Sequence, residues 1–237
     1  MSIQFDKVQP KTKEQLKQLI NYAFKHDIYD LNFIDTSKIT DMSWLFENVK
    51  HNFDISSWDV SNVTDTASMF YYCVNFNCDL SGWDVSNVTT MKYMFACCEK
   101  FNCDLSNWNV SNVTNMSHMF FYCENFDINC FKSWDVSNVT DMRYMFYNCK
   151  NFDCDLSNWD VSNVTDMTSM FAFCNKFDCD LSNWDVSNVT CMYFMFGSCK
   201  QFNCDLSHWN TSKIKNMKYI FKGCNRLTIP NWYKYYK

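Results

Sequence analysis

The chain has very little glycine and proline, three and two residues respectively among 237. Tight turns usually rely on these residues, because glycine adopts positive φ freely and proline fixes a turn-compatible φ. With both scarce, Asn, Asp and Ser are left to make the turns, since their side chains hydrogen-bond to nearby backbone. We therefore expect turns built from short polar side chains.

The chain also lacks an excess of basic residues and any long apolar run. Its net charge is −5, and 20% of its residues are charged. A nucleic-acid-binding surface needs a basic stripe that neutralises phosphates, so nucleic acid is not an expected partner. No apolar run approaches the roughly 18 residues of a membrane-spanning helix, so no membrane span is expected. Residues 1–10 lack the features of a secretory signal, which predicts a cytoplasmic location.

The chain consists instead of one unit repeated almost from end to end. Seven tryptophans recur at intervals of 25, 25, 26, 25, 25 and 25 residues. They are Trp58, Trp83, Trp108, Trp134, Trp159, Trp184 and Trp209. A degenerate earlier copy has Ile34 in the tryptophan position. We call each copy a rung and number the rungs one to eight, from the copy with Ile34 to the copy with Trp209.

Each rung contains two apolar periodicities. The segment from Leu80 to Val88 alternates apolar residues with short polar steps, which is typical of one or two short strands. The segment from Met91 to Cys98 has apolar residues at i, i+3, i+4 and i+7, which predicts one face of a short helix. Neither piece buries its apolar side alone, whereas stacked copies bury a continuous core. The sequence therefore predicts an α/β repeat solenoid of about eight rungs, each of ~25 residues.

Both ends of the repeat array, which covers residues 31–225, carry sequences that predict caps. In residues 1–30, Thr12 and Gln15 form a capping-box pattern, and an apolar helix face from Leu16 to Phe24 follows. Residues 226–237 break the repeat and are rich in aromatic side chains. We expect each cap to cover the apolar face of the adjoining rung.

The unit Leu-Ser-x-Trp-Asp-Val-Ser-Asn-Val-Thr-x-Met-x-x-Met-Phe-x-x-Cys, at Leu80 to Cys98 and at Leu156 to Cys174, resembles a known repeat. It is similar to the bacterial surface-protein repeat of about 26 residues, the domain of unknown function family 285, which is grouped with the BspA-like leucine-rich repeats. The resemblance covers nearly the whole chain and implies a leucine-rich-repeat-like solenoid. Related repeats occur in bacterial cell-surface lipoproteins and in proteins of large DNA viruses, with proposed roles in adhesion and protein interaction. The resemblance thus adds a virion-associated location, and the cell surface as the alternative.

The fifteen cysteines fall mainly into two ladders. Seven occupy one rung position: Cys73, Cys98, Cys123, Cys149, Cys174, Cys199 and Cys224. Five occupy another: Cys78, Cys103, Cys154, Cys179 and Cys204. The five-residue spacing within a rung differs from that of zinc knuckles, and no histidine recurs with it. We expect buried free thiols, with disulfides and a metal site as the alternatives, and no cofactor.

Two polar ladders are also interpreted as structural. Asp or Asn follows each of the seven recurring tryptophans, as at Asp84 and Asn109, and is expected to cap a turn rather than bind calcium. Six Asn-Val-Thr sequons begin at Asn62 and recur once per rung. We expect them to lie inside the core of the repeat, where a glycan on every rung would be hard to fit.

The candidate partner-binding residues are aromatic. The residue before each Met-Phe pair and the residue two after it are four apart, which places them on one face of the predicted helix. At least one of the two is aromatic in every rung, and His118 adds a further ring. The candidates are Trp44, Tyr72, Tyr93, Tyr122, Tyr144, Phe173, Phe194 and Tyr219. These rings either close the flank of the core or form a stripe that binds a protein partner.

The sequence thus favours a non-enzymatic scaffold for protein–protein interaction, monomeric or weakly self-associating. A surface adhesin that binds host protein or glycan is the alternative. An enzyme is not expected, because repetition makes every candidate nucleophile resemble its copies and no catalytic cluster stands apart.

Overall fold

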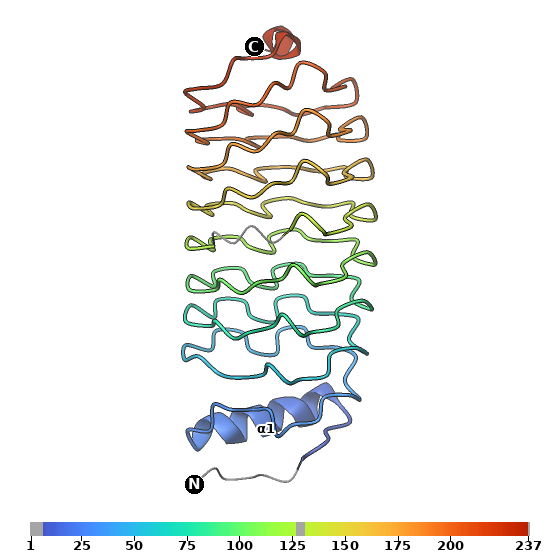
Figure 1. The fold of residues 1–237 in the computed structure, drawn as a ribbon, viewed down its shortest axis with the longest axis vertical. Coiled ribbons are helices and arrows are strands. Elements are labelled where there is room, and N and C mark those ends of the chain that lie inside the picture. Colours follow the sequence, from blue (N-terminus) through green and yellow to red (C-terminus); the bar gives the residue numbers. More distant parts are fainter. Residues whose placement is uncertain (1–6, 127–130, 237) are drawn as a thin grey trace.

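The computed structural model describes residues 7–126 and 131–236, and the chain winds through them as coils stacked one above another (Figure 1). The described helices are α1, Lys13–Lys25, and the 3-10 helix η1, Asn231–Tyr236. They lie at opposite ends of the stack (Figure 1).

Successive rungs are joined in register by isolated parallel β-bridges. One bridge links Asp41 to Asp65, the next links Asp65 to Thr90, and the series continues to the bridge between Cys191 and Asn216. Each bridge joins equivalent positions of neighbouring copies, so the 25-residue spacing of the sequence becomes a vertical alignment. The interval of 26 residues does not disturb it, because the bridge from Asn115 to Asp141 keeps the register.

The helix predicted within each rung is absent from the described residues. Residues 91–98 form turns, in which the N–H of Met94 donates to the carbonyl of Met91 and that of Cys98 to the carbonyl of Phe95. Tyr93 and Cys97 have φ of 57° and 61°, in the left-handed region that ends a right-handed helix. Two tight turns with one left-handed residue each therefore produce the apolar spacing that we interpreted as helical.

The same segment carries the inter-rung hydrogen bonds that were expected of strands. In rung 3 the N–H groups of alternate residues, from Met91 to Cys97, donate to alternate carbonyls of rung 4, from Asn115 to Phe121. The segment from Leu80 to Val88, predicted as strand, contains turns instead, closed by the N–H of Trp83 on Leu80 and that of Val88 on Val85. The described residues form isolated single-residue β-bridges in place of the predicted strands. The chain turns too often for a longer run of β-structure to form.

The interior consists of ladders of identical residues. The ring of Phe95 lies 5.4 Å from that of Phe70 and 5.7 Å from that of Phe120, each within 8° of parallel. The indole N–H of Trp108 donates to the carbonyl of Leu80 at 2.9 Å, and the other ladder tryptophans make the equivalent bond to the rung before. Burial of such rings stabilises each rung by roughly 2–3 kcal/mol per side chain.

Polar ladders satisfy the backbone at the edges of the coil. The Asp or Asn after each tryptophan accepts the N–H of the Ser two residues later, so turn capping is confirmed at all seven positions. The sequon asparagines are solvent-exposed rather than enclosed in the core. Each donates its side-chain N–H to a serine carbonyl of the preceding rung, which gives it a structural role.

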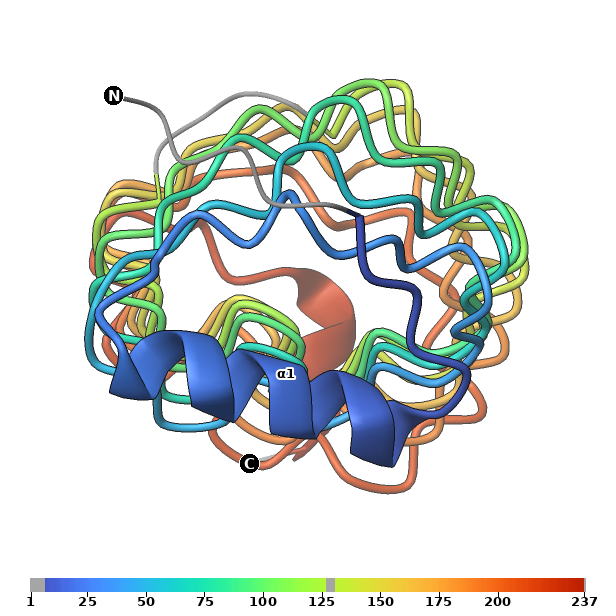
Figure 2. The same cartoon turned by 90° about the horizontal axis from the view of Figure 1, so that it is seen from below.

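Helix α1 lies across the open end of rung 1 (Figure 2). Its N-cap Thr12 accepts the N–H of Gln15, and the side chain of Gln15 accepts the N–H of Lys11, as the capping pattern predicts. Leu16, Ile20 and Ala23 are buried against the core. Helix α1 therefore lies within residues 1–30 and packs against the core with one face.

At the other end, η1 continues the tryptophan ladder. The ring of Trp232 lies 6.5 Å from that of Trp209 and within 10° of parallel, and its indole N–H donates to the carbonyl of Leu206. Trp232 also contacts Phe221. The side chains of residues 235–237 lie outside the described part of this cap.

Candidate functional site

The eight candidate aromatic residues all lie at positive φ, between 53° and 65°. Each rung has two such positions, four residues apart, and each of the eight residues occupies one of them. Positive φ in a residue with a Cβ costs free energy of order 1 kcal/mol, which the inter-rung hydrogen bonds of the same segment offset. The common face of these side chains is thus produced by paired left-handed turns and not by the helix that we predicted.

The rings touch one another in a single series that runs through all eight rungs. The series passes from Trp44 through Tyr71 to Tyr93, then through His118 to Tyr144. It continues from Tyr144 through Tyr147, Phe173, Phe194 and Tyr193 to Tyr219. Tyr72 and Tyr122 join it from the side, through Tyr71 and Tyr147. We call this set, together with Phe121, the aromatic band.

Four rings of the band were missed by the sequence reasoning: Tyr71, Phe121, Tyr147 and Tyr193. Three of them precede the second left-handed position, where rungs 3, 6 and 7 have Ala96, Ala172 and Gly197. The aromatic residues at that position were the available signal. They link the predicted residues, so without them the band would break into separate patches.

The band is only partly shielded by its own contacts. Trp44 and Tyr72 are each 46% exposed, Tyr219 is 42% exposed and Tyr122 is 39% exposed. The other predicted members, such as Tyr93 and Phe194, are half-buried. At Phe194 the ring packs over Gly197, where a Cβ would come within 2.3 Å of it. The band therefore combines packed rings with exposed ones.

Lysine ammonium groups lie over two of the exposed rings. The ammonium of Lys50 is 3.8 Å from the centre of the Tyr72 ring, and that of Lys218 is 4.8 Å from the centre of Tyr219. Such cation–π contacts hold a ring in place at an exposed site and contribute about 0.5–1 kcal/mol.

His118 is the imidazole ring of the band. It is stacked between Tyr93 at 4.1 Å and Tyr144 at 4.7 Å, and its Nδ1 has no hydrogen-bond partner among the described residues. Burial, with a smaller effect of the nearby Arg143 guanidinium, lowers the pKa of His118 to about 4. The imidazole is therefore neutral at pH 7 and serves as an aromatic spacer.

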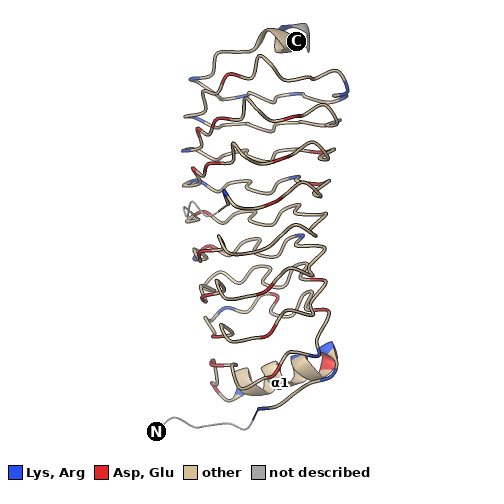
Figure 3. Cartoon of the chain, turned by 45° about the vertical axis from the view of Figure 1, so that its right-hand side comes forward, with Lys and Arg blue, Asp and Glu red and all other residues tan. Residues whose placement is uncertain are grey.

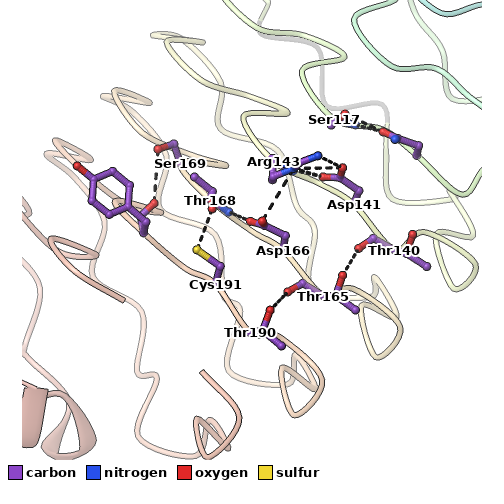
Figure 4. A network of polar contacts seen from close by, with 12 residues as sticks. Ser117, Thr140, Asp141, Arg143, Thr165, Asp166, Thr168, Ser169, Thr190 and Cys191 are labelled. Carbon is purple, nitrogen blue, oxygen red and sulfur yellow. Dashed lines mark hydrogen bonds and ion pairs between the residues drawn. The ribbon is translucent and has the colours of Figure 1, made fainter. Parts of the chain in front are cut away.

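A polar network borders the band on rungs 4 to 7 (Figure 4). Arg143 donates to both oxygens of Asp141 and lies 3.9 Å from a carboxylate oxygen of Asp166. The hydroxyl of Thr168 and the thiol of Cys191 are 3.1 Å apart. This network ties neighbouring rungs together beside the rings, and each of its groups has a partner within it.

Shallow hollows on the coil are lined by a repeated Cys-Asp pair, for example Cys78-Asp79 with Cys103-Asp104. The carboxylates are engaged in turns, since Asp79 and Asp104 each accept the N–H of the Ser two residues on. Among the residues that the structure describes, no three His, Cys, Asp or Glu side chains are placed to hold a metal ion. The described helices include none that is long and apolar enough to cross a membrane.

The first cysteine ladder is buried, as predicted, except for its half-buried last member, Cys224. Each thiol donates to a carbonyl of the preceding rung, as Cys98 does to Phe70 at 3.0 Å. Burial raises the pKa of Cys98 well above its usual value, so the thiol stays protonated and unreactive. Cys130 lies outside the described residues.

Comparison with known proteins gives a family for the chain without a function. No curated protein and no solved structure matches it significantly. One family, described as Mycoplasma protein of unknown function, DUF285, matches residues 14–132 and 123–232. The two matches overlap and together span the whole array of rungs. The chain therefore belongs to the DUF285 family.

Proposed function

We propose that the chain is a non-enzymatic repeat solenoid of the leucine-rich-repeat type, related to the BspA-like repeats, that binds a protein partner through its aromatic band. The stacked coils and the bridges at equivalent positions support the solenoid. The observation that carries the binding role is the unbroken series of rings from Trp44 to Tyr219, with exposed members in separate rungs.

The composition of the band suits a protein interface. Tyr, Trp and Phe are enriched in the cores of interfaces, where they bury a large area at a small cost in side-chain entropy. The band extends along the stack, so a partner that binds it contacts several rungs at once. The irregular choice of residue at each left-handed position then distinguishes one partner from another.

The test compares two sets of exposed tyrosines. A Tyr72→Ser, Tyr122→Ser double variant removes two exposed rings of the band, and Tyr22→Ser removes a 62%-exposed ring from α1 as the matched control. Proteins retained from the native cell are identified by quantitative mass spectrometry after affinity purification. A reproducible set should bind the unaltered chain and the control and be lost from the double variant.

Thermal unfolding of all three proteins gives the decisive companion measurement. We expect closely similar midpoints, because each substituted ring is at least partly exposed to solvent and none lies in the closed interior. If the double variant retains the same proteins, the band is not the binding surface. If it unfolds well below the control, the rings serve packing and the proposal fails.

A further inference from the structure

The inter-rung hydrogen bonds end unpaired at the C-terminal rung. In rung 7, alternate N–H groups from Met192 to Ser198 donate to alternate carbonyls of rung 8, from Asn216 to Lys222. The equivalent N–H groups of rung 8 belong to Met217, Tyr219, Phe221 and Gly223. None of these four has an acceptor in the described part of the chain. The stack therefore ends in a row of four backbone donors, which we call the donor edge.

The cap at this end covers the core and leaves the donor edge unbonded. Trp232 and Tyr233 of η1 pack on the ring of Phe221, at 5.8 and 5.2 Å. Trp232 uses its indole N–H on Leu206. An unpaired edge of this kind is a template for the addition of another extended chain.

This end of the molecule is also basic, in contrast to the rest. Residues 206–237 contain seven Lys and Arg and no Asp or Glu, so all 26 acidic residues lie in residues 1–205 with the other 14 basic ones. In Figure 3 basic residues gather on the uppermost coils, whereas acidic residues are spread along the stack. Lys218 and Lys222 are exposed and alternate with the donors, between Met217 and Tyr219 and between Phe221 and Gly223.

We propose that the donor edge is a docking site for an extended acidic polypeptide segment, which adds to rung 8 as one further strand. Donors on every second residue match the carbonyls that an extended chain presents to one side. Main-chain hydrogen bonds of this type give affinity, and alternate side chains give specificity. The lysines between the donors select carboxylate side chains on the incoming segment.

A second copy of the chain fits this edge less well. The complementary carbonyls of rung 1 belong to Asp41, Ser43, Leu45 and Glu47, and they accept no described backbone hydrogen bond. Helix α1 lies across that end, and the ammonium of Lys13 bonds to Asp41 and Ser43. Contact between two C-terminal ends would oppose donors to donors and lysines to lysines. The lysines thus prevent self-association while they attract an acidic segment.

The experiment uses a peptide of about nine residues with alternating Glu and Thr, long enough to reach four donors at two residues each. The same peptide with Lys in place of Glu is the charge control. Binding to the ¹⁵N-labelled chain is followed by amide chemical shifts and by hydrogen exchange. The amides of Met217, Tyr219, Phe221 and Gly223 should shift and become protected. Those of rung 7, already bonded, should not change.

Matched variants test the role of the lysines. Lys218→Glu with Lys222→Glu should weaken binding of the Glu peptide at least about tenfold, whereas Lys176→Glu with Lys200→Glu, both exposed on other rungs, should change it less than about twofold. If charge reversal lowers the melting temperature, Lys218→Gln with Lys222→Gln gives the same test without introducing negative charge. The proposal is overturned if the Lys peptide binds as well as the Glu peptide or if the amides at the donor edge do not change. It is also overturned if an oligothymidylate binds more strongly than the Glu peptide. Sedimentation as a dimer that protects the donor edge without peptide would overturn it as well.

Discussion

The interior ladders and the aromatic band use the same kinds of ring in opposite ways. Inside, most rungs repeat the same residue at each position, and successive rings such as Phe95 and Phe120 lie within 8° of parallel. On the band, the residue changes from rung to rung, and the angles between rings range from 21° at Tyr93 and His118 to 89° at Tyr71 and Tyr93. A close-packed interior restricts shape and volume, whereas a half-exposed surface tolerates variation. The band is thus the part of the molecule in which the residue can change from one rung to the next.

The largest expected effect comes from breaking an interior ladder. Phe120 is fully buried and stacks on Phe95, Phe126 and Phe146. Its replacement by alanine leaves a cavity between three rings, so Phe120→Ala should lower the free energy of unfolding by about 3–5 kcal/mol. Tyr122→Ala, two residues away on the band, should lower it by less than about 1 kcal/mol. Urea unfolding of both variants measures the difference, and similar losses would mean that the band packs as tightly as the interior.

A smaller loss of stability is expected when an indole that donates a hydrogen bond is replaced, and almost none when the indole has no acceptor. Trp108 is 3% exposed and donates to the carbonyl of Leu80, so Trp108→Phe leaves a buried carbonyl without its donor. The expected loss is about 1–3 kcal/mol. Trp44 is 46% exposed, and its indole N–H has no partner in the described residues, so Trp44→Phe should be nearly neutral. Thermal unfolding of the two variants measures the difference. An equal fall of both midpoints would contradict the prediction.

The sequence predicted what repetition makes visible. The tryptophan spacing located the rungs, the cysteine ladder was predicted to be buried, and Thr12 with Gln15 located the start of α1. The predicted helix was wrong because apolar residues at i, i+3, i+4 and i+7 fit two turns with left-handed residues as well as they fit a helix. Glycine would have marked those turns, but fifteen of the sixteen left-handed positions in the rungs hold another residue, Gly223 being the exception.

The candidate site was predicted in its positions but not in its continuity. Two positions per rung were chosen on helical geometry, and the paired turns place the same two positions on one face. The linking rings, such as Tyr71 and Tyr147, occupy a third position that a helix would have turned away. Trp232 was not recognised as a member of the ladder because it follows Trp209 by 23 residues and lacks the flanking motif. Such contacts depend on the backbone path, which the apolar pattern alone does not determine.

The smallest effect tests how closely the band itself is packed. Because the pKa of His118 is about 4 in the folded chain and ordinarily 6.5, the unfolded chain binds the extra proton as the pH falls below 6.5. The stability contributed by neutral His118 is therefore complete above pH 6.5 and is lost as the pH falls through about 4.

His118→Phe keeps a ring between Tyr93 and Tyr144 but cannot titrate. The slope of the unfolding free energy against pH between 5 and 7 should be shallower in this variant. Burial also lowers the pKa of His51, which titrates in both proteins and gives both the same residual slope. Carboxylates such as Asp135, whose pKa is lowered by its hydrogen bonds from Ser137, contribute mainly at more acidic pH. Equal slopes would show that His118 is as solvated as in the unfolded chain, and the band would then be a row of exposed rings and not a partly packed surface.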